Sequence, residues 1–164
     1  MEIVNVRIDE RLIHGQVARY WTTSLNLHRI MIIDDMAASD DIQQMSLRMA
    51  TLSTMKLSIF SVATAIEKIK ENPYSGERVF IVMKDPETLR RLCDGGVKFP
   101  SVNVGNMSCK HGSVQIRKSV EVTKSDVEHF EYCAKNDISF YAQVLPSDTP
   151  VEFISLLKDL NFDK

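Results

Sequence analysis

The sequence predicts an α/β fold, with one domain built on a mostly parallel, open twisted sheet and helices on both faces. Two observations predict it. Short β-branched runs alternate with longer stretches in which apolar residues recur at helical spacing. The 164 residues also contain no Pro/Ser-rich linker, low-complexity tract or internal repeat, so a single domain is expected over residues 1–164.

Six segments have the composition of strands, because they are short, rich in Val and Ile, and bounded by polar or turn residues. In chain order they are Ile3–Ile8, Arg29–Ile33, Lys56–Ser61, Val79–Met83, Ser101–Val104 and Ile138–Val144. The segment 106–122 is less regular, and we expect a loop followed by a strand or hairpin there. Because helical stretches separate most of the strands, the strands are expected to run parallel.

Helices are expected between the strands. Apolar residues recur every three or four positions in three early segments, Gln16–Leu25, Asp40–Leu52 and Val62–Lys70. In the second of these, Met45 and Met49 fall on the apolar side, and both are interpreted as core residues, as is Met55.

Capping signals predict three later helices. Asp85-Pro86 begins one helix, and Gly95 lies just past its end. Thr123 or Ser125 caps a helix that runs to about residue 136, and Ser125 has the spacing of a capping box with Glu128. Thr149-Pro150 is expected to begin a last helix over residues 151–160.

Composition excludes several classes of protein. A net charge of −2 gives no electrostatic basis for binding nucleic acid. No apolar run approaches the roughly 20 residues that span a bilayer, and the N-terminus lacks a signal-type segment, so a cytoplasmic protein is expected. The three cysteines have no Cys-x-x-Cys spacing and are interpreted as free thiols. No metal-ligand spacing, phosphate-binding loop or dinucleotide fingerprint occurs, so no metal or cofactor is expected.

The most informative motif is "RIDERLIHGQV", Arg7–Val17, where the first strand gives way to the first helix. Loops at the carboxyl ends of strands are where open α/β sheets bind ligands. His14 precedes Gly15 at the helix start, where free N–H groups and the helix dipole favour an anion and disfavour a protonated imidazole. Arg11 adds a cation whose forked geometry suits phosphoryl oxygens. These are the groups that phosphoryl transfer to a histidine requires.

Further residues are assigned to this site. Asp9 is expected either to orient Arg11 or to accept a hydrogen bond from the imidazole nitrogen that does not react. The phosphoryl-binding candidates are Gly15, Gln16, Asp35 and Asn106. Gly15 would allow a bulky group close to the backbone. Asp35 either belongs to a helix-entry loop, which is favoured, or lines the His14 loop, and Asn106 is a candidate contact for the phosphoryl group or a partner.

The complete motif resembles the signature of the B component of enzyme II in the mannose–fructose–sorbose family of the bacterial sugar phosphotransferase system. "GERV" at Gly76–Val79 and "GGVKFPSVNVGNM" at Gly95–Met107 resemble further landmarks of this family, and the likeness covers essentially the full chain. The resemblance implies a phosphocarrier with a mostly parallel α/β sheet. The B component accepts a phosphoryl group from a phosphohistidine of the A component and passes it to a sugar entering through the membrane C and D components.

The resemblance also implies roles and partners. His14 stands at the phospho-acceptor position, Arg11 matches the arginine that steadies the phosphoryl group, and Asp9 matches an acid of the motif. The phosphoryl group comes ultimately from phosphoenolpyruvate and no cofactor is implied. The implied partners are the A component, the membrane C and D components and the sugar, which places the protein in the cytoplasm, peripherally associated with the permease. A homodimer is also allowed, and mannose, fructose, sorbose and amino sugars all remain open.

Two alternatives remain at this stage. One is a receiver-like signalling module, suggested by the acidic pair Asp34-Asp35 in an α/β chain of suitable size, although the segment "SIFSVAT" supplies no acceptor Asp after the third strand. The other is a non-catalytic binding subunit on the same fold, which the intact pair of Arg11 and His14 argues against.

Overall fold

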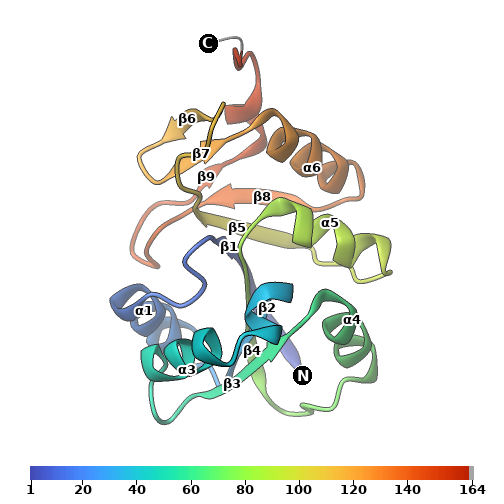
Figure 1. Ribbon diagram of the computed structural model, residues 1–164. Coiled ribbons are helices and arrows are strands. Elements are labelled where there is room, and N and C mark those ends of the chain that lie inside the picture. The colour runs from blue at the N-terminus through green and yellow to red at the C-terminus, as the bar shows by residue number, and fades with distance from the viewer. Residues whose placement is uncertain (163–164) are drawn as a thin grey trace.

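The computed structural model describes residues 1–162 and has the expected α/β architecture (Figure 1). Within these residues, a seven-stranded sheet has the order β3-β2-β4-β1-β5-β8-β9, and a separate two-stranded hairpin pairs β6 with β7. The strands of the large sheet are parallel except β9, which runs antiparallel to β8. The predicted fold class is therefore confirmed.

The helices and strands follow the predicted order. The strands are β1 (Glu2–Asp9), β2 (Arg29–Ile33), β3 (Lys56–Phe60), β4 (Arg78–Met83), β5 (Ser101–Asn106), β6 (Val114–Arg117), β7 (Val120–Val122), β8 (Ser139–Ala142) and β9 (Val151–Glu152). The helices are α1 (Gly15–Leu25), α2 (Asp35–Ser39), α3 (Asp41–Ala50), α4 (Val62–Glu71), α5 (Pro86–Asp94), α6 (Lys124–Lys135) and the 3-10 helix η1 (Ile154–Leu157).

Two apolar cores lie on the two faces of the sheet. In Figure 1, α4, α5 and α6 lie along one side of the sheet, and α1 and α3 lie on the other. Alternate residues of one strand enter different cores. Ile81 belongs to the core that includes residues of α4, α5 and α6, while Phe80 and Val82 belong to the core that includes Trp21 of α1 and Leu47 of α3. This alternation is why the buried central strands read as continuous apolar runs.

The second core does not extend over the whole sheet. Val102 and Val104 of β5 belong to the first core, so Asn103 between them faces the other side, in register with Arg7 of β1 and Tyr141 of β8. Polar side chains therefore replace the apolar core beneath the carboxyl end of β1. This polar half of the face lies directly under the candidate site.

Two predictions about the C-terminal third of the chain are wrong. The segment 151–160 is not one helix: Val151–Glu152 extends the sheet, and Phe153 is buried against Phe130 before η1 begins. Pairing gives the otherwise open edge of β8 a partner, which local helical spacing does not reveal. The capping box of α6 joins Thr123 to Asp126, and not Ser125 to Glu128.

The apolar stripe of α3 faces outward. Leu47 is the buried residue of this helix, whereas Met45 and Met49 are 66% and 82% exposed, so their prediction as core residues is wrong. Met55 does pack against the second core. Helical spacing shows that apolar residues share a face, but only the docking of the helix decides which face meets the sheet.

Candidate functional site

The loop after β1 is held down by two buried side chains. Leu12 adopts a left-handed backbone with φ 61°, and its N–H donates to the carbonyl of Asp9 at 2.9 Å. The side chains of Leu12 and Ile13 enter the second core, while Arg11 and His14 are exposed. A left-handed leucine is uncommon, and burial of both apolar side chains stabilises the conformation that presents Arg11 and His14 to solvent.

His14 is the residue immediately before α1. Its backbone is extended, with φ −128° and ψ 107°, and its carbonyl accepts a hydrogen bond from Ala18 at 3.1 Å. The imidazole forms no hydrogen bond that caps the helix, and His14 is exposed. A Cβ placed on Gly15 would meet nothing within 4 Å, so the space beside His14 is open to a bulky group. The geometry suits a nucleophile that other proteins must reach.

Asp9 is the centre of the site. Its carboxylate is 2% exposed and accepts hydrogen bonds from Arg11 Nε at 3.0 Å, Arg11 Nη2 at 3.1 Å and the Arg11 backbone N–H at 3.2 Å. The first of the two roles expected for Asp9, orientation of Arg11, is thus the one that the contacts support. Because Arg11 remains about one-third exposed, its guanidinium is fixed in direction and still accessible to an anion.

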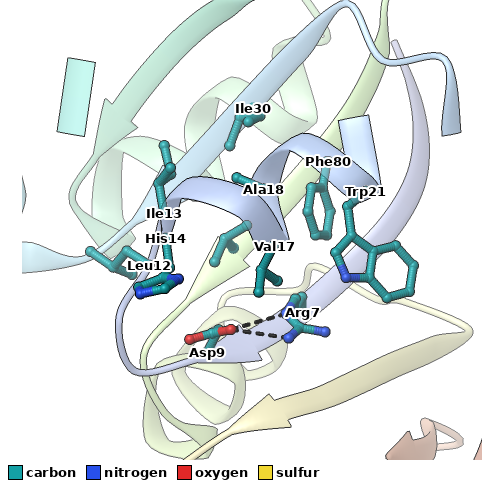
Figure 2. A pocket seen from close by; sticks show the side chains of 11 residues that line it. Arg7, Asp9, Leu12, Ile13, His14, Val17, Ala18, Trp21, Ile30 and Phe80 are labelled. Carbon is teal, nitrogen blue, oxygen red and sulfur yellow. Dashed lines mark hydrogen bonds and ion pairs between the residues drawn. The ribbon is translucent and has the colours of Figure 1, made fainter. Parts of the chain in front are cut away.

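Arg7 is a residue of the candidate site that the sequence analysis missed. It is 2% exposed, and its Nη2 and Nε donate to Asp9 Oδ2 at 3.0 and 3.2 Å (Figure 2). Its Nη1 donates to the carbonyl of Gln143 at 2.8 Å. The guanidinium also lies 5.5 Å from the ring centroid of Trp21. Burial lowers the pKa of Arg7, and the carboxylate of Asp9 counteracts this shift. The available signal was an arginine within the β-branched run of the first strand.

The room for Arg7 comes from a glycine in the neighbouring strand. A Cβ on Gly105 of β5 would overlap the Arg7 guanidinium. With one buried carboxylate between two guanidinium groups, Arg7, Asp9 and Arg11 together carry a net positive charge beside His14. That charge favours a bound phosphoryl group, although an acid stands at the centre of the cluster.

A second contact fixes the loop to the segment after β5. Glu10 accepts hydrogen bonds from the backbone N–H of Ser108 at 2.7 Å and from the Ser108 hydroxyl. Burial opposes ionisation of Glu10, but these bonds and the charges of Lys110 and Lys84 outweigh it and lower the pKa of its carboxyl. Glu10 therefore joins two loops of the site.

The structure brings one phosphoryl-binding candidate to this loop and separates another from it. Asn106 is in register with Asp9, and its carbonyl accepts from the Glu10 N–H at 3.1 Å. Asp35 instead accepts from the backbone N–H of Val62 at 2.9 Å and pairs with Arg91 at 2.7 Å. The hydrogen bond from Val62, followed by that from Arg91, lowers the pKa of Asp35. These contacts match the favoured reading of a helix-entry loop, with Asp34 as the N-cap.

Gln16 lies in the first turn of α1, and its side chain is outside the described part of the structure. Among residues 1–162, no group of three or more His, Cys, Asp and Glu side chains is arranged to hold a metal ion. Within the same residues, no helix is both long enough and apolar enough to cross a membrane.

Comparison with known proteins identifies the family. The family model described as the PTS system sorbose subfamily IIB component matches residues 3–164. The chain belongs to this family. This IIB component is also similar, at 31% identity over 160 residues, to the fructose-specific EIIB component of Bacillus subtilis, with 98% of each chain covered.

Other relatives agree in fold and differ in length. The IIB component has a TM-score of 0.92 and 30% identity to the crystal structure of the IIBSor domain of the sorbose permease from Klebsiella pneumoniae, with 99% of both chains covered. It is 33% identical over 161 residues to the mannose-specific EIIAB component of Escherichia coli K12. That match covers 98% of this chain and 50% of the relative, so the chain spans about half the length of such relatives. These relatives support a phosphocarrier role in a sugar phosphotransferase system.

Proposed function

We propose that this IIB component carries the phosphoryl group on His14. The observation that supports it most is an exposed His14 three residues after Arg11 on the same loop, with the guanidinium of Arg11 fixed by the buried carboxylate of Asp9. Phosphoryl transfer depends mainly on positioning and charge stabilisation, and the fixed guanidinium of Arg11 is suited to both. An exposed loop is needed because a donor protein and an acceptor must reach the same nitrogen in turn.

The transfer proceeds in two steps. In the first, the N–P bond of a phosphohistidine on an A component breaks and an N–P bond forms to His14, while the ring proton of His14 passes, in the net balance, to the donor histidine. In the second, this bond breaks as an O–P bond forms to a sugar hydroxyl, whose proton ends on the imidazole of His14. A phosphoramidate can both receive and give the group, whereas a serine ester would retain it.

Arg11 is assigned the role of binding the phosphoryl oxygens, and Asp9 and Arg7 position it. Gly15 leaves space for the group, and the backbone N–H groups at the start of α1, including that of Gln16, are available donors. Asn106 is proposed to approach the same group from the end of β5. Asp35 carries no role in this scheme, because its carboxylate is occupied by Val62 and Arg91.

The proposed partners follow from the family. An A component donates the phosphoryl group, and membrane C and D components present the sugar, so the chain acts in the cytoplasm at the surface of a permease. A transient interface around His14 suits a protein that must release each partner quickly. A homodimer is compatible with this scheme and is tested by the mass of the protein in solution.

The experiment is phosphoryl transfer from phosphoenolpyruvate, through the general phosphotransferase proteins and a family A component. Mass spectrometry locates the label in the wild type and in His14→Ala. We expect acid-labile, base-stable phosphate on His14 and none in the variant. Folded wild-type protein that remains unlabelled with several competent A components would refute the proposal.

Arg11 has a matched control in Arg19, an exposed arginine one turn into α1. Arg11→Ala is expected to slow labelling of His14 by about a thousandfold or more, as for other arginines that bind a transferring phosphoryl group. Arg19→Ala removes the same charge nearby and should have a much smaller effect. A change below about tenfold in folded Arg11→Ala would count against its role.

A further inference from the structure

A second concave site lies beside the His14 loop. A cleft of about 700 Å³ opens at the carboxyl ends of β5 and β8. Asn106 and Gln143, at the ends of these strands, line it on one side. The turn that joins β6 to β7 contributes Arg117 and Lys118, and the loop after β8 contributes Asp148. Neither the mechanism of phosphoryl transfer nor the family relationship assigns a use to this cleft.

The position of the cleft follows from the topology. The chain leaves β1 through α1 on one face of the sheet, while the connection from neighbouring β5 to β8 passes through α6 on the other face (Figure 1). In open α/β sheets, the crevice between two such strands is where ligands bind. His14 lies on the α1 side of this switch point and the cleft lies on the β5 side, so one edge of the sheet holds both.

A chain of hydrogen bonds joins the cleft to the phosphoryl site. The carbonyl of Gln143, a residue of the cleft, accepts from Arg7 at 2.8 Å, and Arg7 donates to Asp9 at 3.0 Å. Asp9 in turn fixes Arg11. These contacts join the cleft structurally to the loop that holds Arg11 and His14.

One wall of the cleft is positively charged. Arg117 and Lys118 are adjacent and exposed, and among the described contacts neither forms an ion pair or a side-chain hydrogen bond. A forked guanidinium next to an ammonium matches the three oxygens of a phosphate monoester. Two unpaired cations at the edge of a cleft attract such an anion.

The remaining lining is suited to hydroxyl groups. The Ser119 hydroxyl donates to the carbonyl of Gly105 at 2.9 Å, so its oxygen is left as an acceptor towards the cleft. Asp148 uses one carboxylate oxygen for the N–H of Leu145 at 2.8 Å, and its second oxygen can accept from a ligand hydroxyl. Because this carboxylate repels phosphate, the phosphate group belongs at the Arg117 wall and the hydroxyl-bearing part belongs near Asp148.

We propose that this cleft binds the phosphate monoester of a sugar, with the phosphate on Arg117 and Lys118 and the sugar hydroxyls on Ser119 and Asp148. The identification of the hydroxyl-bearing part as a sugar rests on the proposed function, in which a phosphorylated sugar is the product formed next to this face. The cleft is a binding site separate from His14. It binds the phosphorylated sugar, and not the phosphoryl group that His14 carries.

The test is titration of the ¹⁵N-labelled protein with mannose 6-phosphate and fructose 1-phosphate, and in parallel with free mannose and with inorganic phosphate. The amide signals of residues 117–119 and 142–149 report on the cleft. We expect saturable shifts there with a Kd on the order of 1 mM for at least one sugar phosphate, and at least tenfold weaker binding of free mannose and of inorganic phosphate. Arg117→Ala/Lys118→Ala should weaken binding at least tenfold. Lys135→Ala, which removes an exposed lysine on α6, should leave it unchanged.

Two results would overturn the inference. One is the absence of saturable shifts in the cleft below about 10 mM for either sugar phosphate. The other is equal affinity for inorganic phosphate and the sugar phosphates, which would remove the sugar from the assignment. His14→Ala separates this inference from the proposed function, because this variant should lose the phosphoryl label and still bind sugar phosphate in the cleft.

Discussion

The buried carboxylate of Asp9 makes a sharp prediction about stability. Asp9→Asn keeps the size of the side chain but removes the negative charge between Arg7 and Arg11, and it aims an N–H₂ group at guanidinium donors. Arg7 is 2% exposed, so its charge would be left buried without a counter-charge. Breaking a buried ion pair by removing one partner costs about 3–5 kcal/mol.

Loss of the ion pair between Asp9 and Arg11 is expected to have a smaller effect on stability than loss of the pair between Asp9 and Arg7. The Arg11 side chain is 35% exposed, so its ion pair with Asp9 is screened by water and contributes about 1 kcal/mol or less to stability. Arg11→Met should therefore unfold at nearly the wild-type midpoint and still be defective in labelling of His14. Asp9→Asn should lose both stability and labelling of His14, since it removes the partner of the buried Arg7 and frees Arg11.

Urea denaturation followed by circular dichroism measures these differences. The slope of the free energy of unfolding against urea should be the same for all three proteins, so the midpoints report stability directly. In thermal unfolding, Asp9→Asn should melt about 10 °C below the wild type, given a loss of 3–5 kcal/mol in a chain of this size. If Asp9→Asn loses less than about 1 kcal/mol, or no more than Arg11→Met, the account of a charge-dependent buried cluster is wrong.

Three further predictions test other parts of the structure. Gly105→Ala places a methyl group against the buried Arg7 guanidinium and should destabilise the fold by about 1–3 kcal/mol in the same denaturation assay. An unchanged free energy of unfolding would contradict this close packing. The carboxylate of Glu77 accepts a hydrogen bond from Arg29, which lowers the pKa of Glu77 to about 2. Burial opposes this shift, and Lys56 adds to it. A carboxyl whose pKa is lowered by folding stabilises the protein above its unfolded pKa. That contribution, on the order of 1 kcal/mol, should be lost as pH falls from about 4.5 to 2, and Glu77→Gln should remove the dependence in acid titrations of stability. Met49→Ser should change the free energy of unfolding by less than about 0.5 kcal/mol, because Met49 is 82% exposed, and a loss above 2 kcal/mol would show that α3 packs differently.

Much of the fold was predictable because its local and global signals agree. The boundaries of β2, Arg29–Ile33, match the sequence prediction in full, and those of β4 and α1 match within one residue. These segments have strong periodicity and clear turn residues at their ends. The prediction of a helix in the final segment failed because the open edge of β8 and the burial of Phe153 outweighed a local helical pattern. Both effects depend on distant parts of the chain.

The candidate site was predictable in part. The motif placed His14 and Arg11 on a strand-to-helix loop, where the structure has them, because the order of strand, loop and helix is written in the sequence. Asp35 was a weaker candidate since acids commonly follow strands, and the sequence does not show that Arg91 of another helix neutralises it.

By itself, the sequence determined the α/β class, the parallel direction of most strands and the position of the candidate histidine, because periodicity, capping and motif spacing act over a few residues. Only the tertiary structure decided that Arg7 is buried, that Asp9 binds two arginines, and that Asn106 joins their loop. It also decided that the stripe of α3 points to solvent and that a cleft opens beside the site. Each of these depends on which strands become neighbours and which helix face docks, and those choices are made by burial across the whole chain.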